Sequence, residues 1–206
     1  VCPWCYIGKR RFETGFAQID DDLGVDFNIT YHAYQLDPTA APGVATPVRE
    51  AYAKKFGGPE RATEILDHVT SVAAQDNITF NMDIAVRANT FLAHRMLGYA
   101  LKQHGAAIQI VLKEKIMDAY FTNGLNIGEI SVLADCAESA GIPRPEAMTF
   151  LESDSLVNEI RAEIAEASDY GVTAVPTFII NGQWSVPGAQ DVEMFERIIE
   201  RILERA

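Results

Sequence analysis

Two cysteines separated by two residues lie at the start of the sequence, in the run Val1-Cys2-Pro3-Trp4-Cys5. The residues that follow predict a helix from about Trp4, which places Cys2 at its N-terminus and Cys5 in its first turn. The free N–H groups and the positive dipole end of a helix stabilise an anion there. Because the thiolate is the reactive form of cysteine, this position favours a nucleophilic Cys2. Cys5 is close enough to attack a mixed disulfide at Cys2. The spacing therefore predicts a redox-active thiol pair.

The chain holds one further cysteine, Cys136, and four histidines scattered along its length. Structural zinc usually takes four Cys or His ligands, often from two paired clusters, and only one cysteine pair is present here. We therefore expect no metal site. Three cysteines cannot build a disulfide framework for a chain of this size, which suits a reducing compartment and predicts a cytoplasmic location. Cys136 is expected to pack as a small hydrophobic side chain.

Composition and charge limit the partners of this chain. Its 206 residues are 48% hydrophobic and 22% charged, which is typical of a globular protein with a sizeable core. The formal net charge is -12, and so acidic a chain argues against nucleic acid or an anionic membrane as the main partner. No apolar run is long enough to cross a bilayer. The cysteine pair predicts thiols and disulfides as partners, carried by proteins or by small molecules.

The spacing of apolar residues and the positions of Gly, Pro and Asn divide the chain into helices and a few strands. Helices are predicted at about 4–20, 47–56, 59–75, 90–104, 107–121, 128–140, 155–169 and 191–204, with a further helix start near Pro143. Loose alternation predicts a strand over 25–34. The run 175–180 predicts a second strand, and Asn181-Gly182 predicts a tight turn into a third strand at 183–186. Asp191 can cap the last helix.

Strands near both ends and helices between them predict an α/β fold interrupted by an all-helical insertion. We expect residues 1–40 and 155–206 to form one discontinuous domain, and residues 41–154 to form the insertion. A strand normally leads into a helix that carries such a cysteine pair, and none precedes Val1 in this sequence. We therefore expect the first strand of the sheet to be missing from the chain as given.

Four segments of this chain resemble a known family. They are 1–11 (VCPWCYIGKRR), 89–95 (NTFLAHR), 118–127 (DAYFTNGLNI) and 171–190 (GVTAVPTFIINGQWSVPGAQ). The cysteine pair at a helix start, the helical insertion and Val175-Pro176 before a hairpin look like the DsbA-like thiol-disulfide oxidoreductases of the thioredoxin superfamily. More narrowly, the segments are similar to the FrnE-type branch. The resemblance covers essentially the whole chain, and it implies a thioredoxin-like fold and disulfide exchange.

The resemblance also assigns roles to individual residues. It implies that Cys2 attacks and Cys5 resolves, which the spacing indicates as well. It further implies that Pro176 is a cis proline packed against the cysteine loop, and that the Val175 backbone can pair with an extended substrate. Val175 and Pro176, together with Pro3 and Trp4 between the two cysteines, are the predicted substrate-binding residues. Some FrnE-type members carry a second cysteine pair near the C-terminus, and this sequence has none.

Two polar residues, Asn89 and His94, lie in one of the four segments. Both are candidates for the cleft between the two parts of the fold, although a hydrogen-bonded contact between these parts is the favoured interpretation. Trp184, in the predicted hairpin, is expected to serve in packing. Apolar surface on the helical part could belong to the core or to an interface, so the sequence leaves open whether the protein forms a homodimer.

Two other functions stay open beside disulfide exchange. Hydroxychromene carboxylate isomerases and kappa-class glutathione transferases look similar in fold, but they typically carry serine where Cys2 stands, so both cysteines favour redox chemistry. A glutathione-dependent isomerase or transferase is therefore the second interpretation, and a peptide-binding, chaperone-like module is the third. No tightly bound cofactor is expected, although glutathione could be a co-substrate. The redox direction is open.

Overall fold

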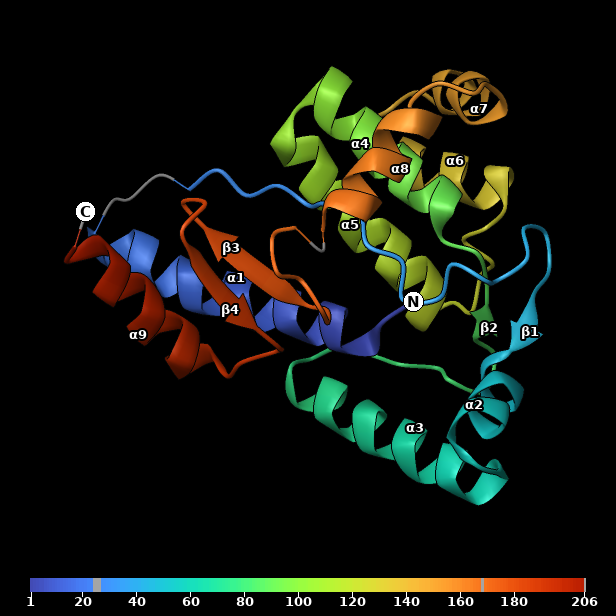
Figure 1. Cartoon of the computed structure of the whole chain (residues 1–206), viewed down its shortest axis with the longest axis horizontal. Coiled ribbons are helices and arrows are strands. Elements are labelled where there is room, and N and C mark those ends of the chain that lie inside the picture. The colour runs from blue at the N-terminus through green and yellow to red at the C-terminus, as the bar shows by residue number, and fades with distance from the viewer. Residues whose placement is uncertain (24–26, 168, 206) are drawn as a thin grey trace.

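The computed structural model describes residues 1–23, 27–167 and 169–205 (Figure 1). Within these ranges the chain forms nine helices and two small antiparallel sheets of two strands each. No helix in the described ranges is long and apolar enough to cross a membrane. The chain is therefore mostly helical, as the sequence predicted, with little sheet.

Helix α1, Pro3–Leu23, carries the cysteine pair at its N-terminal end. Its apolar residues recur at helical spacing, so that Ile7, Phe12 and Ile19 are buried. The helix begins one residue before its predicted start and ends three residues after its predicted end. Differences of this size are normal at helix ends, so the prediction of this helix is confirmed.

Six helices form the middle of the chain. They are α2 (Val48–Phe56), α3 (Pro59–Gln75), α4 (Phe91–His104), α5 (Ala106–Phe121), α6 (Ile130–Ser139) and α7 (Arg144–Glu152). Their inward faces share one large core, in which Leu66, Met96 and Leu112 are fully buried. A short antiparallel pair, β1 (Thr46–Pro47) with β2 (Val86–Arg87), lies beside α2 and has no counterpart in the sequence prediction.

The last part of the chain brings a hairpin against the cysteine helix. Its elements are α8 (Val157–Glu166), β3 (Thr177–Ile180), β4 (Trp184–Pro187) and α9 (Val192–Leu203). Asn181 and Gly182 have φ angles of 53° and 66°, as a tight hairpin turn requires. Asp191 caps α9 by accepting a hydrogen bond from the Met194 N–H (2.8 Å). The predicted hairpin and capped terminal helix are both confirmed.

The strand predicted over 25–34 is wrong for the residues that the structure describes. Residues 27–35 form no strand, and residues 25 and 26 lie outside the described ranges. A strand needs a neighbouring backbone to complete its hydrogen bonds, and here a side chain takes that place. The fully buried Gln109 of α5 accepts from the Tyr31 N–H (2.8 Å) and donates to the Tyr31 carbonyl (2.8 Å). This segment therefore lies against a helix and not in a sheet.

Buried apolar residues form two clusters, and α1 contributes to both. Tyr6 and Ile7 join the large cluster of the helical part, whereas Phe12 joins a smaller cluster with the hairpin and α9. The rings of Phe12 and Phe195 meet edge to face with centroids 5.4 Å apart. Figure 1 shows the hairpin and α9 over the C-terminal part of α1, whereas its N-terminal end points toward the middle helices. The exact domain boundaries at residues 41 and 154 stay a prediction.

Candidate active site

The sulfur of Cys2 lies opposite the backbone of Val175, where α1 meets the loop before β3. Cys2 Sγ is 3.6 Å from the Val175 carbonyl oxygen, a distance at which the thiol can donate to it. Cys5 lies in the first turn of α1, and its N–H donates to the Cys2 carbonyl (3.1 Å). Both thiols are half-buried, and all three cysteines of the chain are free. The two predicted thiols and Val175, distant in the sequence, therefore meet at one place.

The two thiols differ in acidity. The hydrogen bond from the Cys5 thiol, helped by the backbone N–H groups of Cys5 and Trp4, lowers the pKa of Cys2 to about 7 although burial opposes it. The same hydrogen bond, together with burial, raises the pKa of Cys5 well above its ordinary value. Near pH 7, Cys2 therefore loses its proton more readily than Cys5, which stays protonated. The pair therefore presents one nucleophile at neutral pH.

The Val175–Pro176 peptide bond is cis, which confirms the expectation from the family resemblance. The Pro176 carbonyl accepts a hydrogen bond from the Gly188 N–H (2.8 Å), so the proline is tied to the end of β4. On its other side the ring lies against Gly8 of α1, where a Cβ would be only 2.9 Å from Pro176 Cγ. Because glycine has no side chain, Gly8 lets this loop approach α1 closely. This contact holds Val175 beside Cys2.

A cavity of about 980 Å³ opens beside the cysteine pair. Both cysteines, Pro3, Trp4 and Val175 line it at the N-terminal end of α1, and residues of α2, α3, α4 and α5 and of the segment 32–40 line most of the remainder. The Trp4 side chain is 37% exposed, and its ring centroid lies 6.2 Å from that of His68. The predicted binding residues Pro3, Trp4 and Val175 thus border a space of ligand size.

Of the two polar candidates near α4, His94 lines the cavity. Burial, and to a smaller extent the cation of Lys113, lowers the pKa of His94 to about 3, so its ring is neutral at pH 7. Asn89 is not among the described lining residues. Its amide accepts from the Phe91 N–H (2.9 Å) and donates to the Ala40 carbonyl (2.6 Å). Asn89 therefore makes the favoured hydrogen-bonded contact at the start of α4.

Lys113 of α5 lines the same cavity, and sequence reasoning missed it. Its ammonium lies 5.7 Å from the centre of the Tyr31 ring. Burial lowers the pKa of Lys113, while negative charge at Cys5 and Cys2 acts in the opposite direction. A signal was available, because Gln109 and Lys113 are four residues apart and share one face of a helix whose other inward residues are apolar.

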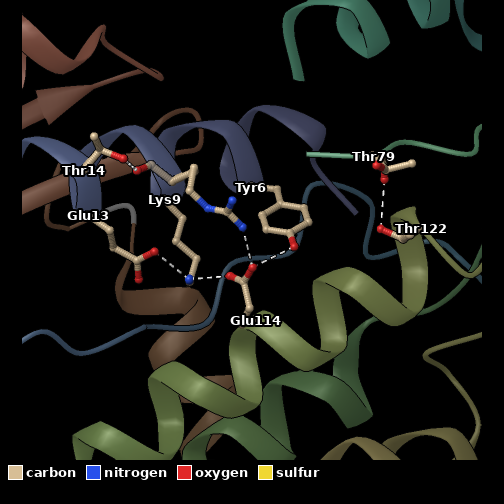
Figure 2. Close-up of polar contacts among 8 residues, drawn as sticks. Tyr6, Lys9, Glu13, Thr14, Thr79, Glu114 and Thr122 are labelled. Atoms are coloured by element: carbon tan, nitrogen blue, oxygen red, sulfur yellow. Dashed lines mark hydrogen bonds and ion pairs between the residues drawn. The ribbon is translucent and has the colours of Figure 1, made fainter. Parts of the chain in front are cut away.

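A network of charged groups fixes α1 against α5 (Figure 2). Lys9, whose side chain is 5% exposed, reaches Glu114 of α5 at 2.5 Å. The same carboxylate accepts from the Tyr6 hydroxyl (2.8 Å) and from the Arg10 guanidinium (2.7 Å). Figure 2 shows Tyr6 and Lys9 converging from α1 on Glu114. Because Lys113 is the preceding residue of α5, the network also holds Lys113 in place relative to the cysteines.

Cys136 of α6 is buried and does not line this cavity. Its Sγ lies 3.7 Å from the Lys115 carbonyl oxygen, and burial raises its pKa to about 11. An unreactive thiol in the core confirms the expectation that Cys136 packs as a hydrophobic side chain.

Similarity to known proteins extends over almost the entire chain. A family model described as a DSBA-like thioredoxin domain matches residues 1–200. The chain belongs to this DsbA-like family. Among curated proteins, the DsbA-like chain is similar to the uncharacterized protein YwbO of Bacillus subtilis. The two are 26% identical over 201 residues, which are 97% of this chain and 91% of YwbO.

Solved structures show the same relationship in three dimensions. A probable DsbA oxidoreductase from Streptomyces coelicolor matches the DsbA-like chain with a TM-score of 0.89 and 27% identity, over 100% of this chain and 87% of that one. A 2-hydroxychromene-2-carboxylate isomerase matches with a TM-score of 0.66 and 19% identity, over 99% and 92%. The second likeness concerns the fold alone. Together with the family match, these structures confirm the predicted DsbA-like thioredoxin fold.

Proposed function

We propose that this DsbA-like protein is a thiol-disulfide oxidoreductase, which exchanges disulfides with protein or small-molecule thiols through Cys2 and Cys5. The observation that carries the proposal is the setting of Cys2. Its half-buried thiol, whose pKa is lowered, borders a cavity and lies 3.6 Å from the Val175 carbonyl. The narrower FrnE-type assignment and a cytoplasmic location belong to this proposal, and both rest on the sequence.

In the reducing direction, the Cys2 thiolate attacks one sulfur of a substrate disulfide. The substrate S–S bond breaks, a disulfide forms between Cys2 and the substrate, and one substrate thiolate leaves. Cys5 then gives up its proton and attacks Cys2 Sγ, which forms the Cys2–Cys5 disulfide and releases the second substrate thiolate. Two electrons pass from the cysteine pair to the substrate. A dithiol donor restores the pair by the reverse exchange, and an oxidised pair runs the same steps as substrate oxidation.

The backbone of Val175 supports a role in positioning the substrate. In the dithiol state its carbonyl is within reach of the Cys2 thiol. Once Cys2 is part of a disulfide, its sulfur carries no proton, so this carbonyl becomes available to a donor from the substrate. An extended chain could then pair with the Val175 backbone as an added strand does.

Insulin reduction with dithiothreitol as donor tests this function. The wild-type protein should accelerate insulin precipitation, and Cys2→Ser should abolish the acceleration. Incubated with insulin in the absence of dithiothreitol, reduced Cys5→Ser should accumulate a mixed disulfide, detectable as a mass increase that dithiothreitol removes. Cys136→Ser is the matched control, because its thiol is buried in α6 and should leave the rate unchanged. Undiminished exchange by Cys2→Ser would refute the proposal.

The reduction potential of the cysteine pair, measured against a glutathione series, decides the direction. A value near or below the cytosolic poise of roughly -220 to -320 mV supports a reductant, and a value well above it supports an oxidase or isomerase.

A further inference from the structure

The cavity beside the cysteines carries a charge opposite to that of the chain. The whole sequence has a formal net charge of -12. Among the described residues that line the cavity, however, five are basic and three are acidic. The basic residues are Lys54, Lys55, Arg61, Arg87 and Lys113, and the acidic ones are Asp37, Glu50 and Glu64. A positively charged cavity in an acidic protein favours the entry of anionic ligands.

Two of the five cations are already neutralised within the chain. Arg87 forms an ion pair with Asp37, whose carboxylate its Nε approaches to 3.0 Å, and Arg61 pairs with Glu64 (2.7 Å). In the described part of the chain the three lining lysines form no ion pair with an acidic side chain, and only one lining carboxylate remains to balance them. The unpaired charge of the cavity is therefore positive.

Lys113 is the lysine whose charge interacts with the thiols of Cys5 and Cys2. It is half-buried on α5, so a partner must enter the cavity to reach it. Apart from the Cys2 thiolate, whose charge is lost once Cys2 joins a disulfide, its neighbours there supply no counter-charge, because His94 is neutral and Tyr31 offers a ring face. An ammonium group drawn from water without a partner is costly, and a carboxylate forms a strong charge-assisted hydrogen bond with it. In the mixed disulfide, in which Cys2 carries no charge, the site therefore lacks an anion that the bound substrate could supply.

We propose that the disulfide exchanged at Cys2 belongs to a small molecule that bears carboxylate groups, and that Lys113 binds one of them. This inference rests on the proposed function of the cysteine pair. A volume of about 980 Å³ accommodates a peptide-sized thiol, and Cys2 and Lys113 both line it. One molecule can therefore present its sulfur to Cys2 and its carboxylate to Lys113. Lys54 and Lys55 of α2, both exposed, provide cations where a longer ligand extends.

Three small disulfides of different charge test the inference. Oxidised glutathione is anionic, bis(2-hydroxyethyl) disulfide is neutral, and cystamine is cationic. The rate of single-turnover oxidation of the reduced protein is measured with each and divided by the rate of dithiothreitol with the same disulfide. This corrected rate should be about tenfold higher for oxidised glutathione than for the neutral disulfide, and lowest for cystamine. Equal corrected rates would overturn the inference, and so would a preference for cystamine, the order expected from the net charge of -12 alone.

Variants on α5 assign the effect to one lysine. Lys113→Gln should lower the corrected rate for oxidised glutathione about tenfold relative to the neutral disulfide. Lys115→Gln is the matched control, because Lys115 is exposed on the same helix and outside the cavity, and it should change neither rate. An equal fall for all three disulfides would mean that Lys113 acts on the thiols alone, which would overturn its binding role.

A binding measurement separates this inference from the proposed function. S-methylglutathione carries the same carboxylates but has no disulfide or thiol to exchange. Calorimetry should detect its binding to the Cys2→Ser/Cys5→Ser variant and a loss of at least tenfold in affinity when Lys113→Gln is added. Such binding without insulin reduction by the wild type would refute the proposed function alone. Reaction with the neutral disulfide without this binding would refute the inference alone.

Discussion

Replacing Gly8 with alanine tests whether the close approach of the Val175-Pro176 loop to α1 sets the reactivity of Cys2. A Cβ at this position would lie 2.9 Å from Pro176 Cγ and 3.3 Å from both Cα and Cβ of Ala189. Ordinary contacts of a Cβ begin at 3.4 Å, so the proline ring must move by about 0.5 Å. The ring is rigid and bonded to Val175, so the carbonyl beside Cys2 moves with it.

Two opposing effects decide the stability of Gly8→Ala. Alanine is favoured over glycine inside a helix by about 1 kcal/mol, whereas overpacking a filled interior costs about 1–3 kcal/mol. We therefore expect the free energy of unfolding in urea to fall by about 0–2 kcal/mol. The effect on activity should be larger, because the Val175 carbonyl no longer lies at its present distance from Cys2 Sγ. Insulin reduction should fall about tenfold.

Gly15→Ala is the matched control on the same helix. Its Cβ would lie 3.0 Å from the Val192 carbonyl oxygen of α9, so the crowding is comparable but distant from the thiols. This variant should lose similar stability and keep its insulin reduction. Full activity in Gly8→Ala, or an equal loss in Gly15→Ala, would refute the reasoning that the contact at Gly8 positions the site.

Three further predictions concern the thiol pair and the core. Cys5→Ala removes the largest cause of the low pKa of Cys2, so the midpoint of Cys2 alkylation should rise from about 7 toward the ordinary thiol value. Since only thiolate reacts, the rate at pH 7 should fall at least fivefold, and an unchanged midpoint would contradict the assignment. Gln109→Leu leaves the backbone N–H and carbonyl of Tyr31 unpaired and should cost about 2–4 kcal/mol in urea unfolding. Arg95→Met removes hydrogen bonds to carbonyls of the loop before α8 and should cost about 3 kcal/mol, with alkylation of Cys2 unchanged.

The elements that the sequence predicted correctly have signals carried by neighbours along the chain. Residues 181 and 182 specify their turn by their own backbone preferences, and Asp191 satisfies an N–H only three residues away. The helices of the middle part show their buried faces directly as periodic apolar residues. The placement of Cys2 and Cys5 on α1 follows from the same local reasoning.

What the sequence left undetermined depends on contacts between distant segments. The alternation over 25–34 is typical of a strand, but a pairing partner cannot be seen in it, and Gln109 takes that place. Lys113 becomes a site residue only because α5 packs beside the N-terminal end of α1. The cis bond at Pro176 has no local sequence signature, since only a small minority of X–Pro bonds in folded proteins are cis. The family resemblance alone predicted it.

The contact between Cys2 and Val175 joins residues that are 173 positions apart. During synthesis at about 5–20 residues per second, the later residue follows the earlier one by about 9–35 s. For that interval the two N-terminal sulfurs exist without the loop that will cover them, and any oxidant or thiol in the surroundings can react with them. The redox poise of the compartment in which this chain folds therefore influences the oxidation state in which the site is completed.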